Sequence, residues 1–231
     1  MPASPSSACW RTPEIAAMTD PQHNGAPGPP TPMIVGCMKA HARLLGRLET
    51  VDDVVVSRPS RLPGWSVGHV LTHVARNADS FVNMLEAAAA GQSVPQYPGG
   101  REQRAADIER GSSRRAAACV NDVRQSAERL EAVMAEAPAA VWEAFGLGWD
   151  GQPAPCRNIP SRRWKEVEIH HVDLGLGYEA EDWPADFVSF ALVDTLHDLP
   201  PRIADARQRA AMLAWLTGRR DTPGPIEFTP Y

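Results

Sequence analysis

Two carboxylate–imidazole pairs occur within one short stretch of the chain, Ser161–Gly177. Glu166 precedes His170 by four residues, and Glu168 precedes His171 by three. Residues three or four apart lie on the same face of an α-helix, so either pair could offer two ligands to one divalent metal ion. A third ligand would have to come from another part of the chain.

The best source of a third ligand is the segment Trp65–Asp79, which contains His69 and His73. Its apolar residues recur at helical spacing and predict a long amphipathic helix. On a helical wheel, His73 lies at the edge of the apolar stripe, whereas His69 points further out. This geometry mildly favours His73 as an inward ligand. A surface or helix-capping role for these histidines stays open at this point.

The helix expected after Ser161 has its own apolar stripe. This stripe consists of Trp164, Val167, His171 and Leu174. Glu166 and His170 flank the stripe, as metal ligands in the core of a bundle do. Glu168 lies on the other side, and His171 is expected to pack or to orient a neighbour. Asp173 is close to Glu166 in angle and is expected to support a ligand.

Two histidines and one carboxylate leave a coordination position open for water or substrate. Zinc accepts this ligand set, and iron(II) accepts it as well, so the ligand types alone do not settle the metal. The sequence contains no H-E-x-x-H and no P-loop. A G-x-S-x-G match occurs at Gly64–Gly68, but it follows a connector and a turn and not the strand that a nucleophile elbow requires. The corresponding classes of metalloprotease, serine hydrolase and nucleotide hydrolase are therefore not indicated.

The elements that would position these residues are helices. The periodicity predicts helices from Pro32 to about Thr50, from Ser66 to about Ala90, across Arg101–Ala137 with a break near Gly111, and from Ser161 to the glycines at 175 and 177. These helices predict a mainly α protein, a four-helix bundle with a crossover connection. His41, on the apolar side of the first helix, is expected to be buried and hydrogen-bonded. Trp142 and Trp149 lie in an irregular connection, where they could line a pocket or cover the core.

Three regions follow from the composition. Residues 1–31 are rich in Pro, Ser, Gly and Ala and are expected not to fold. Residues 32–180 are expected to form the bundle, and residues 181–231 a short C-terminal appendage. In this appendage we expect a helix over Asp186–Leu199, ended by Pro200 and Pro201, and a second helix over Gln208–Thr217.

Composition also limits the function classes. The chain has 231 residues, 43% of them hydrophobic, and a net charge of −5. A negative net charge does not indicate binding to nucleic acid or to an anionic membrane. No apolar run is long enough to span a bilayer. The four cysteines show no C-x-x-C spacing, so neither a thiolate zinc site nor a disulfide scaffold is indicated. The N-terminus lacks a signal-peptide core, and a reducing cytoplasm is the expected location.

Three motifs carry a family resemblance. The motif P-G-W-S-x-G-H-V-L-T-H-V-A-R-N-A-D at Pro63–Asp79 resembles the N-terminal signature of the mycothiol-dependent maleylpyruvate isomerases and their actinobacterial relatives. The stretch Ile159–Tyr178 resembles the second signature of this family, and Leu213–Arg219 resembles its C-terminal signature. The family belongs to the DinB/YfiT-like superfamily of metal-binding four-helix bundles.

The resemblance implies site residues. The family's metal ligands fall on His73, Glu166 and His170, in agreement with the helical wheels. Its C-terminal arginine falls on Arg219, which the resemblance implies to be a catalytic residue that contacts an anionic substrate. The family also has a small C-terminal β-sheet. The segment before the Leu213 motif is too short to hold it, so the appendage is expected to be truncated.

The resemblance also implies a reaction. Zinc would bind the sulfur of mycothiol, the thiol cosubstrate, and lower its pKa. The thiolate would add to the cis double bond of maleylpyruvate, and rotation followed by elimination would give fumarylpyruvate. Two alternatives stay open, a mycothiol S-transferase that conjugates electrophiles and a non-catalytic metal-binding bundle. The expected partners are a small thiol and a small anionic or electrophilic substrate, without nucleic acid or membrane, for a monomer or homodimer.

Overall fold

A computed structural model describes residues 28–227 of the chain, and the prediction for residues 1–31 falls almost entirely outside this range. The described residues divide into two compact units, residues 28–184 and residues 185–227. The first unit contains α2 (Thr31–Leu48), α3 (Asp53–Val56), α4 (Val67–Ala89), α5 (Gly100–Ser112), α6 (Ala116–Glu136), α7 (Ala139–Glu143), β1 (Phe145–Leu147), β2 (Pro153–Pro155), η1 (Cys156–Asn158), α8 (Ile159–Asp173) and η2 (Ala180–Asp182). The second contains α9 (Ala185–Arg202) and α10 (Ala206–Leu216). The predicted mainly α class is confirmed.

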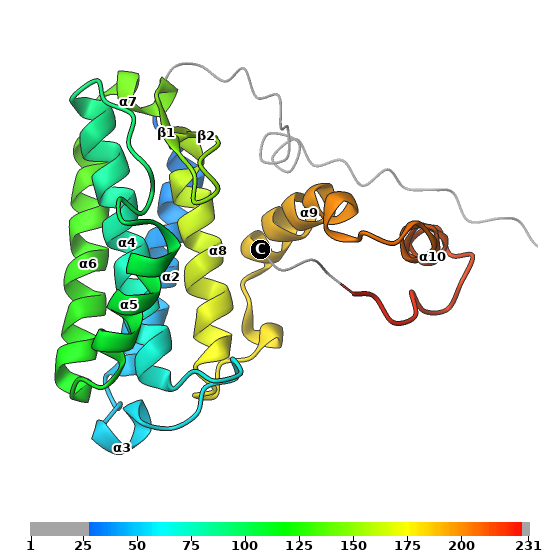
Figure 1. Ribbon diagram of the computed structural model, residues 1–231, viewed down its shortest axis with the longest axis horizontal. Coiled ribbons are helices and arrows are strands. Elements are labelled where there is room, and N and C mark those ends of the chain that lie inside the picture. The colour runs from blue at the N-terminus through cyan, green and yellow to red at the C-terminus, as the bar shows by residue number, and fades with distance from the viewer. Residues whose placement is uncertain (1–27, 228–231) are drawn as a thin grey trace, which may run out of the picture. The chain divides into compact units, whose positions relative to one another are not determined.

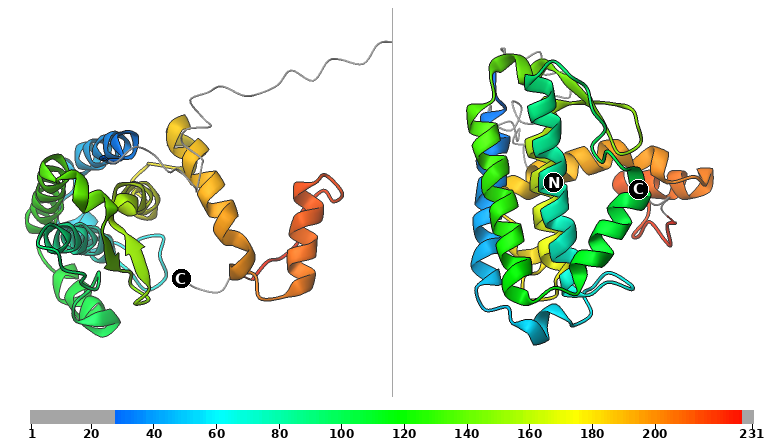
Figure 2. Two further views of the ribbon diagram at one scale, coloured as in Figure 1. Left: turned by 90° about the horizontal axis from the view of Figure 1, so that it is seen from above. Right: turned by 60° about the vertical axis from the view of Figure 1, so that its left-hand side comes forward.

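Four long helices, α2, α4, α6 and α8, lie side by side and form the bundle (Figure 1). Contacts between α4 and α6 advance in the same direction along both helices, from Arg76–Asp122 to Asp79–Arg129, so these two helices are parallel. Helices α2 and α8 are also parallel, because Gly36 lies against Trp164, and Arg43, further along α2, pairs with Glu168, further along α8. The two parallel pairs run in opposite directions, because His73 and Asn77 of α4 meet α8 in reverse order. The crossover that parallel neighbours require is α5, which crosses one side of the bundle (Figure 2).

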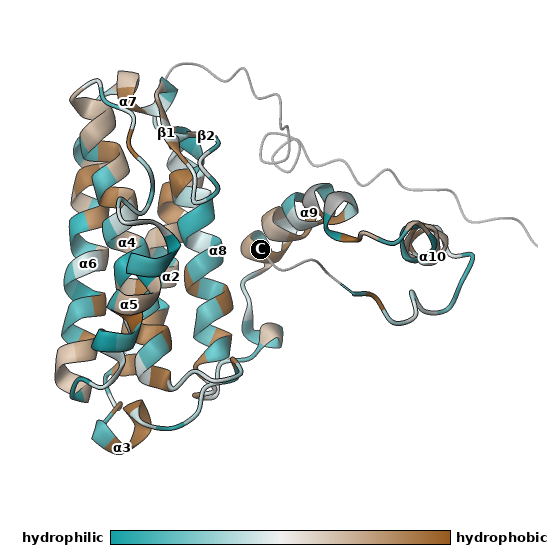
Figure 3. Ribbon diagram, in the orientation of Figure 1, coloured by the Kyte–Doolittle hydropathy of each residue, from teal (hydrophilic) through white to brown (hydrophobic). Residues whose placement is uncertain are grey.

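The helices approach one another most closely at glycines. At Gly36 of α2, a Cβ atom would lie 2.4 Å from ring atoms of Trp164 of α8. At Gly68 of α4, a Cβ atom would lie 2.2 Å from the carbonyl oxygen of Ser112. The core between the helices is apolar, whereas α5 is hydrophilic along most of its outer surface (Figure 3). Gly36 therefore allows α8 to lie close to α2, and Gly68 allows the end of α5 to lie close to α4.

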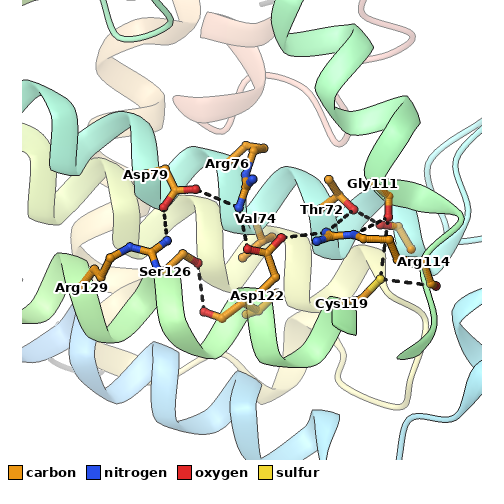
Figure 4. A network of polar contacts seen from close by, with 12 residues as sticks. Thr72, Val74, Arg76, Asp79, Gly111, Arg114, Cys119, Asp122, Ser126 and Arg129 are labelled. Atoms are coloured by element: carbon orange, nitrogen blue, oxygen red, sulfur yellow. Dashed lines mark hydrogen bonds and ion pairs between the residues drawn. The ribbon is translucent and has the colours of Figure 1, made fainter. Parts of the chain in front are cut away.

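A row of ion pairs joins α4 to α6 on the outside of the bundle (Figure 4). Asp79 pairs with Arg76 at 2.9 Å and with Arg129 at 2.5 Å. Asp122 pairs with Arg76 at 2.6 Å and with Arg114 at 2.7 Å. Each carboxylate is shared by two guanidinium groups, so the row is continuous over several helical turns. Networks of this kind fix geometry better than isolated surface pairs do.

The connection between α6 and α8 covers one end of the bundle. Its two short strands pair antiparallel, with Gly146 opposite Ala154. Trp142 is fully buried and packs as a core residue. Trp149 is 37% exposed, and the guanidinium of Arg101 lies 4.1 Å from its ring centroid. The two tryptophans therefore differ in role, and the core-covering interpretation holds for Trp142.

The second unit consists of helices α9 and α10, and residues 185–227 contain no strand. The prediction that Pro200 and Pro201 end the first of these helices is wrong, because α9 continues to Arg202. Proline has a helical φ angle, so the chain keeps its helical course through Pro200 and Pro201, although neither residue has the N–H that would donate to the carbonyl four residues earlier. Helix α10 begins after Asp205, whose carboxylate accepts hydrogen bonds from two backbone N–H groups. None of the helices in residues 28–227 combines the length and the hydropathy that crossing a bilayer would need.

Candidate metal centre

Three predicted ligands meet between α4 and α8. The Nε2 atom of His73 lies 3.1 Å from Oε2 of Glu166 and 3.0 Å from Nε2 of His170. Glu166 Oε2 and His170 Nε2 are 3.6 Å apart. No other group of three or more His, Cys, Asp or Glu side chains within the described part of the chain is arranged to hold a metal ion.

Helix α4 positions His73 and excludes His69 from this cluster. The side chain of Ser66 caps α4, and the backbone N–H of Ser66 donates to Nδ1 of His69 at 3.1 Å. The other ring nitrogen of His69 lies 3.2 Å from Oε2 of Glu109. His69 is therefore a capping residue, and His73, one turn further along α4, is the histidine that turns inward.

Helix α8 supplies the other two residues. It begins at Ile159 after Asn158, two residues before the predicted start at Ser161. Pro160 fits the first turn, where no N–H is needed, and the hydroxyl of Ser161 donates to the carbonyl oxygen of Asn158 at 2.9 Å. Gly175 follows the helix with a φ of +66°, a conformation that favours glycine. Glu166 and His170 are one turn apart on α8, as their spacing predicts.

A carboxylate orients His170. Oδ2 of Asp173 lies 2.7 Å from Nδ1 of His170, as expected for a residue that supports a ligand. This contact fixes the Nδ1–H tautomer, so Nε2 faces His73 and Glu166. Metal-binding histidines generally donate their second ring N–H to a carboxylate or carbonyl in this way.

The charges of the cluster also suit a cation. Burial lowers the pKa of His73 to about 4, although Glu166 opposes this shift. Burial disfavours the charged form of Glu166, but hydrogen bonds from His170 and His73 outweigh it and hold its pKa well below 4.5. Burial likewise opposes charge on His170, yet Asp173 and Glu166 raise its pKa to about 9. A bound metal ion would displace the Nε2 proton of His170. The two imidazoles and the ionised carboxylate, with donor atoms this close, would then fit a divalent metal such as zinc.

Two arginines at the site were missed by the sequence analysis. Nη2 of Arg104, on α5, lies 2.9 Å from Nδ1 of His73. Arg163 of α8 is fully buried; its Nε donates to His41 at 3.0 Å, and its Nη1 donates to Asn77 at 2.8 Å. The ring of Trp65 meets His73 edge-on, with centroids 5.7 Å apart. Arg104 thus adds positive charge beside the cluster, and Arg163 supports it from the core.

The second carboxylate–imidazole pair belongs to another environment. Glu168 is completely buried and accepts from Arg43, from Tyr178 at 2.7 Å and from Trp164 at 3.3 Å. His171 stacks on Tyr178, with ring centroids 3.8 Å apart. Glu168 and His171 therefore hold α8 against α2 and are not part of the metal cluster.

The remaining predicted residues are His41 and Arg219. His41 is buried, and its Nδ1 lies 2.7 Å from Oε1 of Glu131, so the prediction of a hydrogen-bonded core histidine is confirmed. Arg219 belongs to residues 185–227, just after α10, and its guanidinium donates to the carbonyl oxygen of Thr217. Its predicted contact with substrate stays a prediction.

Comparisons with known proteins agree with the first two motifs. Residues 37–175 match the sequence model described as the mycothiol maleylpyruvate isomerase N-terminal domain. A crystal structure of mycothiol-dependent maleylpyruvate isomerase superposes with a TM-score of 0.66 at 28% identity, covering 71% of this chain and 68% of that one. A mutant of that isomerase with a histidine replaced by alanine gives the same TM-score at 27% identity and the same coverage. Curated protein sequences gave no match.

Proposed function

The chain belongs to the mycothiol maleylpyruvate isomerase family, and from this premise we propose that it is a metal-dependent enzyme that uses mycothiol to convert maleylpyruvate, or a close cis-unsaturated analogue, into its trans isomer. The observation that carries the proposal is the cluster of His73, Glu166 and His170. All three residues lie inside the segment that matches the family. Asp173 completes the arrangement that a catalytic metal site needs.

The metal proposed for this cluster is zinc, held by Nε2 of His73, Nε2 of His170 and a carboxylate oxygen of Glu166. When bound, zinc would lower the pKa of a thiol at the open position and so supply a thiolate at neutral pH. The described cysteines do not offer such a nucleophile themselves. Burial raises the pKa of Cys37 to about 12, and it raises the pKa of Cys119 and of Cys156 too. An external thiol therefore fits this chain.

The reaction balances without a further reagent. The thiol sulfur forms a C–S bond to one carbon of the cis double bond, and the displaced electron pair moves onto the conjugated carbonyl oxygen. Rotation then occurs about the carbon–carbon bond that was the double bond and is now single. When the C–S bond breaks, the electron pair re-forms the double bond in the trans geometry, and the thiol is recovered.

The residues of this chain would hold the substrate and its charge. We assign to Arg104 the binding of a substrate carboxylate, because its guanidinium lies next to His73 and pairs with no carboxylate among the described residues. The Trp65 ring, edge-on to His73, is proposed as an apolar wall of the site. Arg219 is the family-implied anion contact and is proposed as a second one. Asp173 keeps the imidazole of His170 in the tautomer that leaves Nε2 available.

One observation favours a second candidate. The family resemblance implies a C-terminal sheet, whereas residues 185–227 contain two helices and no strand. A smaller C-terminal unit could admit other electrophiles, so conjugation of mycothiol to an electrophile is the alternative reaction. It would use the same cluster and the same thiol.

The experiment measures metal content and product together. Purified protein should contain about one zinc per chain, and His73→Ala and Glu166→Ala should lose it. Glu109→Ala is the matched control, because Glu109 is exposed and, among the described residues, its carboxylate contacts only the capping residue His69. With mycothiol and maleylpyruvate, a trans product with recovered thiol supports the isomerase. A stable thioether product would support the transferase, and protein that takes up no zinc would refute both reactions.

A further inference from the structure

A cavity lies between α2 and α8, away from the metal cluster. Its volume is about 390 Å³, and it is lined by Arg43, Gly46, Arg47, Thr50, His171 and Tyr178. All these residues belong to the unit of residues 28–184. We propose that this cavity binds a small oxyanion, either a carboxylate or a phosphate group. The proposal does not depend on the function proposed above.

Buried polar atoms without partners are the first support. Nε of Arg43, Nδ1 of His171 and Nε2 of His171 are buried and have no hydrogen-bond partner among the described residues. Nearly all buried polar groups in folded proteins are paired, so three unpaired atoms on two neighbouring lining residues indicate a missing partner. An oxygen atom of an anion can accept from the Nε–H of Arg43 and from the ring N–H of His171.

The charge balance is the second support. Arg43 and Arg47 bring two positive charges to the cavity wall. The carboxylate of Glu168 opposes them, but it already accepts from Arg43, Tyr178 and Trp164. Among the described residues, Arg47 donates only to the carbonyl oxygen of Gly177, at 3.3 Å. The cavity therefore keeps an excess of positive charge and a guanidinium that no described carboxylate neutralises.

The shape of the wall suits a small planar or tetrahedral group. The rings of His171 and Tyr178 are stacked 12° from parallel and form one rigid side. Gly46 leaves its part of the wall open, because no atom lies within 4 Å of the position where its Cβ would be. Arginine forks match carboxylate and phosphate oxygens in this geometry. Thr50 also lines the cavity.

The test titrates the purified full-length protein with inorganic phosphate and, separately, with acetate. Backbone amide signals of Arg47 and Thr50 are followed by NMR. We expect saturable one-to-one binding, and the tighter of the two probes identifies whether phosphate or carboxylate is the preferred group. Arg47→Ala should weaken this binding roughly tenfold or more, the usual effect of losing a charged hydrogen bond. Arg47 is exposed, so the variant is expected to fold.

The matched control is Lys39→Ala, which removes one positive charge from an exposed position on the same helix. If both variants weaken binding equally, general electrostatic attraction explains the effect and the proposal is wrong. The proposal is also wrong if neither anion saturates the amide shifts. Glu166→Ala separates the two sites, because it should abolish zinc binding and leave anion binding within about twofold of wild type.

Discussion

Replacing Gly36 with alanine tests whether close contact between α2 and α8 determines the stability of the bundle. The new Cβ would lie 2.4–2.5 Å from three ring atoms of Trp164. The indole is 2% exposed and its Nε1 is held by Glu168, so it has little room to move. Overpacking costs about 1–3 kcal/mol, whereas alanine gains about 1 kcal/mol over glycine inside a helix. The clash involves several ring atoms, so we expect a net loss of about 1–2 kcal/mol.

Gly46→Ala is the matched control on the same helix. No atom lies within 4 Å of the Cβ that it adds, so only the helix-propensity gain of about 0.5–1 kcal/mol should remain. The two variants should therefore differ by about 2–3 kcal/mol in the free energy of unfolding, measured in urea with an unchanged m-value. Equal midpoints, or a Gly36→Ala variant more stable than wild type, would show that the spacing between α2 and α8 adapts freely. The zinc affinity of Gly36→Ala should also fall, because α8 carries Glu166 and His170.

Three further predictions concern single side chains. Asp173→Asn should weaken zinc binding by roughly 10–100-fold, measured by competition with a chromophoric chelator, because His170 loses the carboxylate that orients it; unchanged affinity would contradict that role. Burial, together with the positive charge of Arg163, keeps the pKa of His41 below its ordinary value of 6.5. Since the unfolded chain then binds more protons, the free energy of unfolding should fall as the pH drops below about 6.5. His41 alone should contribute up to about 1.4 kcal/mol per pH unit, so a His41→Gln variant should show a shallower slope. Ser66→Ala should cost about 1 kcal/mol by urea unfolding, because α4 loses its N-terminal cap, and a change below about 0.3 kcal/mol would refute the capping role.

Local spacing was enough to predict much of the site. Glu166 and His170 are candidate ligands four residues apart on one helix, and the apolar stripe of α8 indicates which side faces the core. The choice between His69 and His73 was harder on the wheel alone. A signal was present nonetheless, because Ser66 and His69 are three residues apart, the spacing of a capping box.

Long-range contacts could not be predicted in this way. Arg104 belongs to a strongly charged helix, and such a pattern is typical of a helix face exposed to solvent. Only the course of α5 through the fold brings Arg104 beside His73. The sequence around Arg163 does not indicate that this residue is buried, because its hydrogen-bond partners lie on α2 and α4. Helix ends were also uncertain where proline was the signal. Proline permits a first turn at Pro160 and a last turn at Pro200, so its presence does not locate the boundary.

The parallel arrangement of α4 with α6, and of α2 with α8, also shapes the electric field of the bundle. Aligned peptide dipoles give each helix about half a positive charge at its N-terminus and half a negative charge at its C-terminus. Parallel neighbours bring like poles together, but the two pairs run in opposite directions, so each end of the bundle holds poles of both signs. His170 lies in the last turn of α8, within reach of the negative pole, whereas His73 lies beyond the first turn of α4, where the positive pole has faded. The backbone of α8 therefore favours a cation at the place where the two histidines meet.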